Sequence, residues 1–493
     1  MSEVRPVRFL HRGHTVEVAA CADPTRTVLQ WLREDAHCTG TKEGCAEGDC
    51  GACTVVLGEL DEAGALALKP VNACIRFLPT IDGKALFTVE DVAAADGALH
   101  PVQQAMVDCH GSQCGFCTPG FVMSLWAGYE NHREAGTPPT RRQLADELSG
   151  NLCRCTGYRP ILDAGERCHA VADAPRLARQ PVVAALQALQ AGQPLAEPGR
   201  FHAPRTVDEL ASCLLQRPQA RVLAGATDIG LWVNKQFRDL GEIVYVGDVA
   251  ELRRIGIDDG SIRIGAAVSL EDAWAALTAE WPALRDVWLR FASLPVRHAG
   301  TMGGNVANGS PIGDSAPVLI ALGATVVLRR GVQWRGLPLE DFYVDYMKNR
   351  LEPGEFVRAI EVPRRGAREQ RFRVYKISKR FDSDISAVCA ALCIELDGER
   401  VAAARLVFGG MAGIVKRAWG AEAALIGQPW TETTLRAATT ALATDFKPLT
   451  DLRASAAYRM QVAQNLLRRF WLETRPVNPL PESAVSVWAR QEA

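Results

Sequence analysis

The chain has 493 residues, of which 48% are hydrophobic and 23% charged, and its formal net charge is −2. This composition is typical of a globular protein, and the near-neutral charge excludes a global basic field that would attract nucleic acid or an anionic membrane. The length suggests about three domains.

Targeting signals are absent from the sequence. The N-terminal segment MSEVRPVRFL lacks the apolar core of a signal peptide. The longest apolar stretch, residues 316–328, is interrupted by Gly323 and Thr325 and is shorter than the ~20 residues that span a bilayer. We therefore expect a cytoplasmic protein. Because the cytosol keeps thiols reduced, the fifteen cysteines are expected to bind metal rather than to form disulfides.

The first elements in chain order predict a small α+β domain. Residues 5–20 alternate as two short strands around a turn at His11–His14, and Thr25 or Thr27 caps a helix that continues to Leu32. A glycine-rich loop follows, and a strand at Thr54–Leu57 leaves it. Strand, helix, loop and strand in this order are typical of a compact α+β unit.

The glycine-rich loop carries Cys45, Cys50 and Cys53 in C-x4-C-x2-C spacing, and Cys74 follows. This is the plant-type ferredoxin spacing for a [2Fe–2S] cluster, whose loop must wrap an inorganic core closely. Buried free thiols are one alternative, which the polar sequence disfavours. Structural zinc is the other, although it usually takes C-x2–4-C pairs in both halves of its site.

A helical segment begins near residue 89. Helices are expected to start at Thr118-Pro119, after the capping box that Thr140 opens, and near Tyr158. This segment contains two further cysteine pairs, Cys114 with Cys117 and Cys153 with Cys155. A thioredoxin-like pair is disfavoured, because a second pair is present and a βαβ pattern is not. The spacing by itself leaves two-iron and four-iron clusters open.

The rest of the chain predicts a linker and then two α/β segments. Residues 170–200 are rich in Ala, Gln and Pro, which favours an interdomain linker. Strands are expected at Arg221–Ala224, Ile243–Val246 and Ile262–Val268, with Ser269 capping a helix. Near residue 370 a second segment begins, strand-rich to about Phe408 and helical afterwards.

Two glycine-rich segments favour a phosphate-bearing ligand, namely RVLAGATDIG from Arg221 and RHAGTMGGNVANGSPIGDSAP from Arg297. Backbone amides in such loops can cradle a pyrophosphate, although glycine and asparagine clusters also form plain turns. The chain contains neither a G-x-G-x-x-G fingerprint nor a Walker A motif, so a nucleotide would not be held in either of those cradles.

Both cysteine sets, with the flanking sequences GSQCGFCTPGFVMS and GNLCRCTGYRPI, resemble the iron–sulfur part of the xanthine dehydrogenase family of molybdenum hydroxylases. The resemblance covers residues 1–165 and implies two [2Fe–2S] clusters. It implies that Cys45, Cys50, Cys53 and Cys74 hold one cluster and that Cys114, Cys117, Cys153 and Cys155 hold the other. The remaining seven cysteines are expected to be small buried residues, with Cys109 near the second cluster: Cys21, Cys38, Cys109, Cys168, Cys213, Cys389 and Cys393.

Residues 200–480 resemble the FAD domain and its C-terminal companion in the same family. The resemblance implies that the FAD pyrophosphate is lined by Val222, Leu223, Ala224, Gly225, Ala226, Thr227, Asp228, Ile229, Gly300, Thr301, Gly304 and Asn305. It implies that Asp314 accepts hydrogen bonds from the polyol chain and that Phe291 lies against the flavin system. Val357, matched by pattern more than by identity, and Lys376 are expected near the isoalloxazine ring.

The implied architecture is a multidomain α+β fold. Its expected parts are a ferredoxin-like β-grasp domain (1–84), a four-helix-type iron–sulfur domain (85–168), a linker (169–198), a PCMH-like α+β FAD-binding domain (199–370) and a C-terminal α/β domain like that of CO dehydrogenase flavoproteins (371–485).

The implied function is electron transfer in NAD-dependent oxidation of hypoxanthine and xanthine to urate. No catalytic residue is expected in this chain, because the resemblance implies that the molybdenum cofactor and the substrate site lie on a large partner subunit, in a heterotetramer with two copies of each. Electrons are expected to pass through the helical-domain cluster, the plant-type cluster and FAD to NAD+. In the family, the loop at Tyr375–Ser386 helps to set whether NAD+ or dioxygen accepts them; a solvated turn is the alternative.

Three other functions remain open at this point. The same relay could serve a molybdenum hydroxylase that acts on an aldehyde, nicotinate or a hydroxybenzoyl thioester. A zinc-binding interaction scaffold would use the cysteines without redox chemistry. A stand-alone NADH diaphorase would need no partner subunit.

Overall fold

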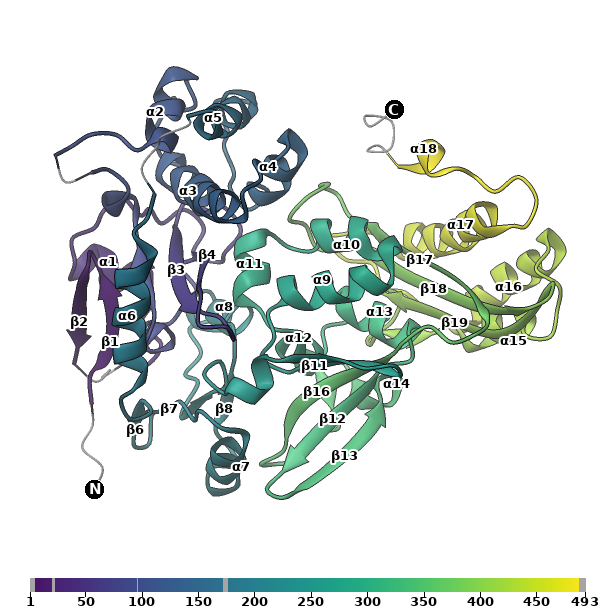
Figure 1. Ribbon diagram of the computed structural model, residues 1–493. Coiled ribbons are helices and arrows are strands. Elements are labelled where there is room, and N and C mark those ends of the chain that lie inside the picture. Colours follow the sequence, from purple (N-terminus) through teal and green to yellow (C-terminus); the bar gives the residue numbers. More distant parts are fainter. Residues whose placement is uncertain (1–4, 20–22, 95, 172–175, 487–493) are drawn as a thin grey trace. The chain divides into compact units, whose positions relative to one another are not determined.

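The computed structural model describes residues 5–19, 23–94, 96–171 and 176–486 (Figure 1). Its contacts divide the chain into two compact units. Unit 1 comprises residues 1–253, 269–271 and 292–301, and unit 2 comprises residues 254–268, 272–291 and 302–493. Both units combine helices with sheets, as expected for a multidomain α+β chain.

Unit 1 begins with a five-stranded mixed sheet. Its strands, in spatial order, are β2 (His14–Val18), β1 (Val7–His11), β5 (Ala85–Phe87), β3 (Thr54–Leu60) and β4 (Leu66–Asn72). Only β1 and β5 are parallel among these pairs. Helix α1 (Val28–Glu34) is capped by Thr27, one of the two predicted caps, in a reciprocal box with Gln30. Its apolar face joins a core around Phe9 and Val55.

Four α-helices follow, in agreement with the expected helical unit. They are α2 (Pro101–Asp108), α3 (Thr118–Ala135), α4 (Arg141–Glu147) and α5 (Arg159–His169). The predicted starts at Thr118, Thr140 and Tyr158 are confirmed, because Thr140 caps α4 and the other two helices have a proline in their first turn. Phe121, Met123 and Ile161 are fully buried in the shared core.

Within the expected linker, residues 179–190 form helix α6 (Arg179–Gln190), which the sequence analysis did not predict. Val182 and Leu186 are buried against the core of the helical segment, and Figure 1 shows α6 beside β1. Arg179 also donates hydrogen bonds to the carbonyl oxygens of Leu66 and Glu130, at 2.7 and 3.0 Å. The helix tolerates Pro181 because the first turn of a helix needs no amide donor.

The remainder of unit 1 is a small sheet with helices. Its strands, in spatial order, are β6 (Ala196–Glu197), β7 (Phe201–His202), β9 (Ile243–Tyr245) and β8 (Arg221–Leu223), and β9 runs parallel to both β7 and β8. The helices are α7 (Val207–Gln216), α8 (Ile229–Asn234) and α11 (Leu294–Ala299). The strands at β8 and β9 begin where the sequence predicted them.

Unit 2 contains two antiparallel sheets. The first has the order β10 (Ile255–Ile257), β11 (Ser261–Gly265), β16 (Phe356–Pro363), β12 (Thr325–Arg330) and β13 (Gln333–Pro338). The second has the order β17 (Glu369–Ile377), β18 (Val388–Asp397), β19 (Arg400–Gly409) and β20 (Lys416–Arg417). A short β14–β15 hairpin (Tyr343–Asp345, Lys348–Asn349) is separate from both sheets.

The helices in and around unit 2 are α9 (Leu270–Glu280), α10 (Arg285–Arg290), α12 (Met302–Asn308), α13 (Ser315–Ala321), α14 (Leu339–Phe342), α15 (Trp419–Leu425), α16 (Glu432–Asp445), α17 (Ala456–Thr474) and α18 (Glu482–Val485). The change from strands to helices after about Phe408 is confirmed. Strand β11 ends three residues before the predicted Val268, and α9 starts directly after Ser269.

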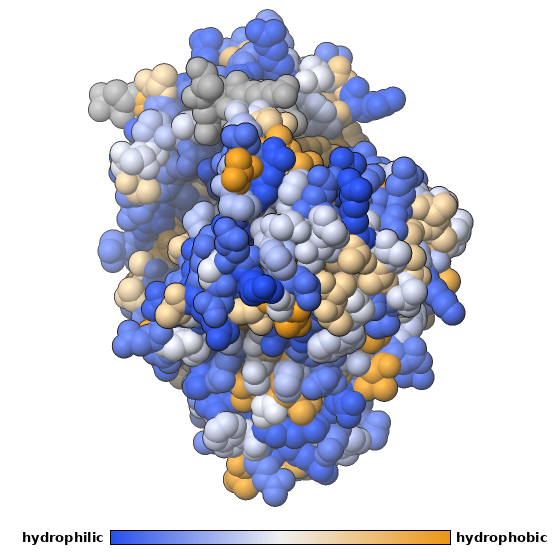
Figure 2. Space-filling view, turned by 90° about the vertical axis from the view of Figure 1, so that its right-hand side faces the viewer, coloured by the Kyte–Doolittle hydropathy of each residue, from blue (hydrophilic) through white to orange (hydrophobic). Residues whose placement is uncertain are grey.

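The surface resembles that of an ordinary globular protein. Figure 2 shows hydrophobic residues scattered among hydrophilic ones on the face that it presents. In the described ranges, no helix combines the length and the apolar character that crossing a membrane requires.

The fully buried Leu392 tests the core of the second sheet, because it lies on the central strand β18. Leu392→Ala should lower the free energy of unfolding by about 2–5 kcal/mol, since it removes packing and leaves a cavity. Denaturant unfolding measures the change. Leu449→Ala is the matched control, because Leu449 is 72% exposed. Equal effects of the two substitutions would contradict the packing described above.

Candidate functional site

The first cysteine set brings four thiols into one group in unit 1. The Cys45 thiol interacts with the thiols of Cys50 and Cys74, and the Cys53 thiol interacts with that of Cys74. The backbone amide of Cys50 donates to the sulfur of Cys45 at 3.4 Å. The hydrogen bonds from Cys50 and Cys74 hold the pKa of Cys45 far below its usual value. Four thiols linked in this way fit an iron–sulfur cluster, because the irons would take the sulfur lone pairs and displace the protons.

The second cysteine set forms two pairs, each with one member from either motif. The Cys117 thiol interacts with that of Cys153, and the Cys114 thiol interacts with that of Cys155. Burial, and then the contact with Cys153, raises the pKa of Cys117 to about 12. Among the described residues, no three His, Cys, Asp or Glu side chains are arranged as ligands of one metal ion. Paired thiols fit a two-iron cluster, because each iron takes two cysteines.

The seven remaining cysteines lie outside both sets. None of the fourteen cysteines in the described ranges forms a disulfide. Four of the seven outside the two sets are buried as expected, namely Cys38, Cys168, Cys389 and Cys393. Cys109 and Cys213 are only partly buried, so the expectation is wrong for them, and Cys21 lies outside the described residues.

The loops of the two cysteine sets are joined directly to each other. The amide of Leu152 donates a hydrogen bond to the carbonyl oxygen of Cys50 at 3.0 Å, and the Asn151 side chain donates to Gly51 at 3.1 Å. Gly51 has φ +69°, and a methyl group added there would lie 2.1 Å from the carbonyl oxygen of Gly150. One peptide hydrogen bond therefore connects Cys50 to the residue that precedes Cys153.

Ten of the predicted FAD residues lie in unit 1, in two loops that meet. Residues 222–229 turn sharply at Gly225, where an added methyl group would lie 1.9 Å from the carbonyl oxygen of Ala299, next to Gly300 and Thr301. The amides of residues 225–228 have no acceptor within the described part of the chain. A run of free amides fits the oxygen atoms of a pyrophosphate.

The other six predicted FAD residues lie in unit 2, namely Phe291, Gly304, Asn305, Asp314, Val357 and Lys376. Phe291 ends α10 and is buried beside Trp274, with ring centroids 5.8 Å apart. Val357 is buried in β16, and Gly304 and Asn305 lie on α12.

Asp314 and Lys376 form a buried ion pair within unit 2. The Lys376 ammonium donates to Asp314 Oδ2 at 2.6 Å, and the Ser386 hydroxyl donates to Asp314 Oδ1 at 2.6 Å. Lys376 also donates to the Ser386 hydroxyl at 2.9 Å, and all three side chains are buried. Each carboxylate oxygen retains acceptor capacity for a further donor, such as a polyol hydroxyl.

The loop between Lys376 and Ser386 is folded against α10. Arg290 donates to the carbonyl oxygen of Phe381 at 3.0 Å, and its guanidinium lies 4.4 Å from the centroid of the Phe381 ring. The Asp384 carboxylate accepts the amide of Arg380 at 2.7 Å. The segment is thus a structured loop that follows the buried Lys376, with the exposed basic residues Lys379 and Arg380.

Three family models match the chain. A [2Fe-2S] binding domain matches residues 88–166, an FAD binding domain in molybdopterin dehydrogenase matches residues 196–365, and a CO dehydrogenase flavoprotein C-terminal domain matches residues 373–474. This chain carries the iron–sulfur and FAD portion of a molybdenum hydroxylase.

Relatives of this molybdenum hydroxylase portion are considerably longer proteins. Xanthine dehydrogenase of Emericella nidulans is 32% identical over 94% of this chain and 38% of its own length. Xanthine dehydrogenase of Drosophila subobscura is 32% identical over 79% of this chain and 33% of its own length. The chain therefore spans only about a third of the relatives that it matches.

Solved structures match 56–58% of the chain. A chain of carbon monoxide dehydrogenase from Hydrogenophaga pseudoflava is 27% identical, with a TM-score of 0.52 over 56% of this chain and 96% of that chain. A chain of quinoline 2-oxidoreductase from Pseudomonas putida 86 is 23% identical with a TM-score of 0.52, which shows a shared fold alone.

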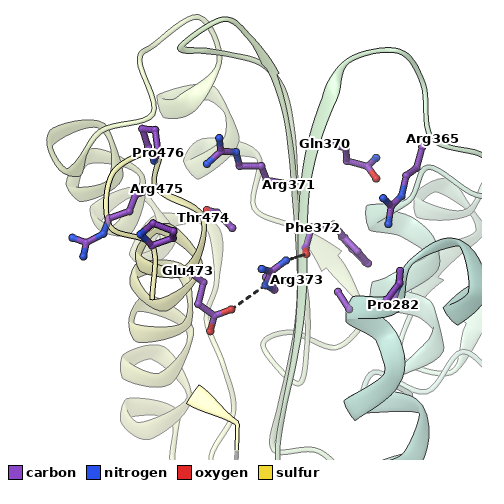
Figure 3. Close-up of a pocket in the computed structure, with 12 residues that line it drawn as sticks. Pro282, Arg365, Gln370, Arg371, Phe372, Arg373, Glu473, Thr474, Arg475 and Pro476 are labelled. Carbon is purple, nitrogen blue, oxygen red and sulfur yellow. Dashed lines mark hydrogen bonds and ion pairs between the residues drawn. The ribbon is translucent and has the colours of Figure 1, made fainter. Parts of the chain in front are cut away.

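A pocket of about 530 Å³ in unit 2 contains none of the predicted cofactor residues of this molybdenum hydroxylase portion. It lies at the start of β17, beside the end of α17 and Pro282 (Figure 3). Its buried Glu473 accepts hydrogen bonds from Arg373 and Arg469. This ion pairing braces α17 against β17.

Sequence reasoning missed several residues that connect the predicted site. Ser386, Asn151 and Leu152 all contact predicted site residues, and Asn234 does so as well. Ser386 ends the loop that the sequence singled out, and Asn151 and Leu152 directly precede Cys153, so their neighbourhood was a usable signal. Asn234 offers no such signal, because it lies 160 residues from the cysteine that it contacts.

Gly51 tests the contact between the two cysteine loops. Gly51→Ala should perturb the EPR signals of both clusters, because the new methyl group would force the loops apart. Gly64→Ala is the matched control: Gly64 has φ +77° and no atom within 4 Å of the added methyl group. Unchanged signals in the Gly51 variant would contradict the proposed neighbourhood of the clusters.

Lys376 tests the buried ion pair. Lys376→Met should lower the free energy of unfolding by about 3–5 kcal/mol, because it leaves the Asp314 carboxylate buried without its cation. Denaturant unfolding checks this, with Lys379→Met as the control, since Lys379 is exposed and donates only to a backbone oxygen. Adding Asp314→Asn to the Lys376 variant should recover part of the loss. A double variant less stable than the single one would contradict this account.

Proposed function

We propose that this chain is the electron-transfer subunit of a xanthine dehydrogenase. In this proposal, Cys45, Cys50, Cys53 and Cys74 hold a plant-type [2Fe–2S] cluster, and Cys114, Cys117, Cys153 and Cys155 hold a second one. The predicted residues of the glycine-rich loops bind FAD, NAD+ accepts the electrons, and a large partner subunit carries the molybdenum cofactor. The hydrogen bond from Leu152 to Cys50 is the observation that carries the proposal.

That hydrogen bond favours electron transfer because it shortens the route between the two cysteine sets. Iron–sulfur clusters exchange single electrons and a flavin exchanges one or two, so together these groups supply the link between one-electron and two-electron chemistry. In this proposal, residues of the chain hold each cofactor. The cysteine thiolates bind the irons, and the amides of residues 225–228 bind the pyrophosphate of FAD. The Lys376–Asp314 pair fixes the loop that ends at Ser386.

Purine oxidation is supported by the relatives that match most of the chain, which are named xanthine dehydrogenases. Just over half of the chain is also similar to chains of carbon monoxide dehydrogenases, so the choice of substrate belongs to the partner rather than to this chain. The predicted boundaries at residues 84, 168, 198, 370 and 485 are part of the same proposal.

The deciding experiment is co-expression of the chain with its molybdenum-cofactor subunit and an assay of xanthine-dependent NAD+ reduction. Turnover with an aldehyde but not with xanthine would move the proposal to another molybdenum hydroxylase. A colourless chain without flavin and iron bands would overturn the relay and favour a zinc scaffold. Dioxygen reduction as fast as NAD+ reduction would contradict the assigned acceptor.

Cys74→Ser tests the ligand assignment. The substitution should lose or perturb the EPR signal of the plant-type cluster and preserve that of the helical-domain cluster, because Cys74 belongs to the first thiol group alone. Cys38→Ser is the matched control, since Cys38 is a buried cysteine outside both sets. The assignment fails if both cluster signals survive Cys74→Ser unchanged.

A further inference from the structure

Helix α8 directly connects the free amides of residues 225–228 with the first cysteine loop. It begins at Ile229, immediately after those amides, and ends at Asn234. Residues 225–228 and the first cysteine loop both belong to unit 1. A rigid helix that starts at one predicted cofactor loop and ends at another is suited to fix their separation.

The Asn234 side chain hydrogen-bonds to two separate segments of the first cysteine set, one at Ala46 and one at Cys74. Its amide nitrogen donates to the carbonyl oxygen of Cys74 at 2.7 Å and to that of Ala46 at 3.1 Å. Ala46 follows Cys45, so both bonds end at or beside a proposed cluster ligand. Asn234 is only half-buried, but both of its amide hydrogens are directed at this loop.

The first turn of α8 also packs closely on the same loop. A methyl group added at Gly230 would lie 2.8 Å from Cβ of Ile75 and 2.9 Å from its carbonyl oxygen. Ile75 follows Cys74 and is 3% exposed. Ile229 and Trp232 pack against the hydrophobic core that contains Cys74. The contact between α8 and the loop therefore has a packed part and a hydrogen-bonded part.

We propose that Asn234 positions the plant-type cluster against the FAD loop and raises the reduction potential of that cluster. The inference rests on the proposed function, because it requires the first cysteine set to hold a cluster. Reduction adds a negative charge to the cluster. The Asn234 N–H groups point their positive ends at the Cys74 peptide, and this partial positive charge stabilises the added negative charge. Hydrogen bonds around iron–sulfur centres tune reduction potentials in this way.

The charged side chains near Asn234 contribute little to the reduction potential of the plant-type cluster, so the effect comes from the Asn234 amide group. The neighbouring Lys235 and Glu47 form an ion pair at 4.0 Å, with both side chains more than 40% exposed. Such exposed pairs are screened by solvent and interact weakly. Their opposite charges also largely cancel at the cluster loop.

The test is an EPR-monitored redox titration of the holoenzyme carrying Asn234→Leu or Asn234→Asp. Leucine removes both donors at similar volume, and aspartate puts a negative charge in their place. The potential of the plant-type cluster should fall in the order Asn, Leu, Asp. In the leucine variant, the ratio of reduced plant-type to reduced helical-domain cluster should fall about fivefold for each of the two hydrogen bonds removed.

Two comparisons separate a specific change in the potential of the plant-type cluster from general damage to the protein. The helical-domain cluster in the same molecules should keep its potential, because Asn234 contacts only the first loop. Asn131→Leu is the matched control, since the Asn131 amide donates to the carbonyl oxygen of Leu68 at 2.9 Å, away from both cysteine sets. Iron content reports cluster assembly in every variant.

Each outcome bears on a different claim. Two intact clusters with an unmoved plant-type potential in both Asn234 variants would overturn the inference and leave the proposed function standing. An equal shift in the Asn131 variant would also overturn it, because the effect would then be a general one. Absence of iron–sulfur signals from the unsubstituted protein would overturn the proposed function itself.

Discussion

The peptide hydrogen bond from Leu152 to Cys50 is the constraint on which the N-terminal half of the proposed relay depends. It requires the two cysteine loops to approach within van der Waals contact, and that approach is possible only because residue 51 is glycine. Asn151 then closes the contact by donating to Gly51 and to the Thr54 hydroxyl, both at 3.1 Å. The mixed sheet and the helices also share a hydrophobic core, because Val56 and Leu68 of the sheet belong to the same buried cluster as Phe121 of α3.

The same principle of close backbone contact extends from the cysteine loops to the glycine-rich loops of unit 1. Gly225 packs on the backbone at Ala299, and Gly230 packs on that of Ile75. Side chains at these positions would hold the segments apart, whereas glycine lets loops from distant parts of the sequence share one structure. The short helix α8 follows Gly225 and contains Gly230, so it transmits the position of one loop to the other.

Unit 2 stabilises its predicted site by a different interaction. Lys376 and Asp314 are both buried, so each depends on the other, and Ser386 completes the arrangement by donating to the carboxylate. Removing one partner would leave a charge in a site of low polarity, which is why such pairs fix geometry strongly. The ion pair joins the start of α13 to the end of β17 and to the end of the 376–386 loop.

Several elements followed from local sequence because their signals are local. The capping box at Thr140, the prolines in the first turns of α3 and α5, and the cysteine spacing all act over a few residues. Helix α6 was missed because its proline-rich surroundings resemble a linker, and its burial depends on a core contributed by other segments. The division of the FAD residues between two units was equally invisible, since it depends on which distant segments pack together.

The sequence by itself determined which side chains can bind iron and which loops can receive phosphate, because those properties belong to residue types and short spacings. Only the tertiary structure decided how the thiols pair, how the two cysteine loops meet, and that Asn234 reaches the carbonyl of Cys74. Those contacts join residues as many as 160 positions apart, and folding alone brings such residues within hydrogen-bonding distance.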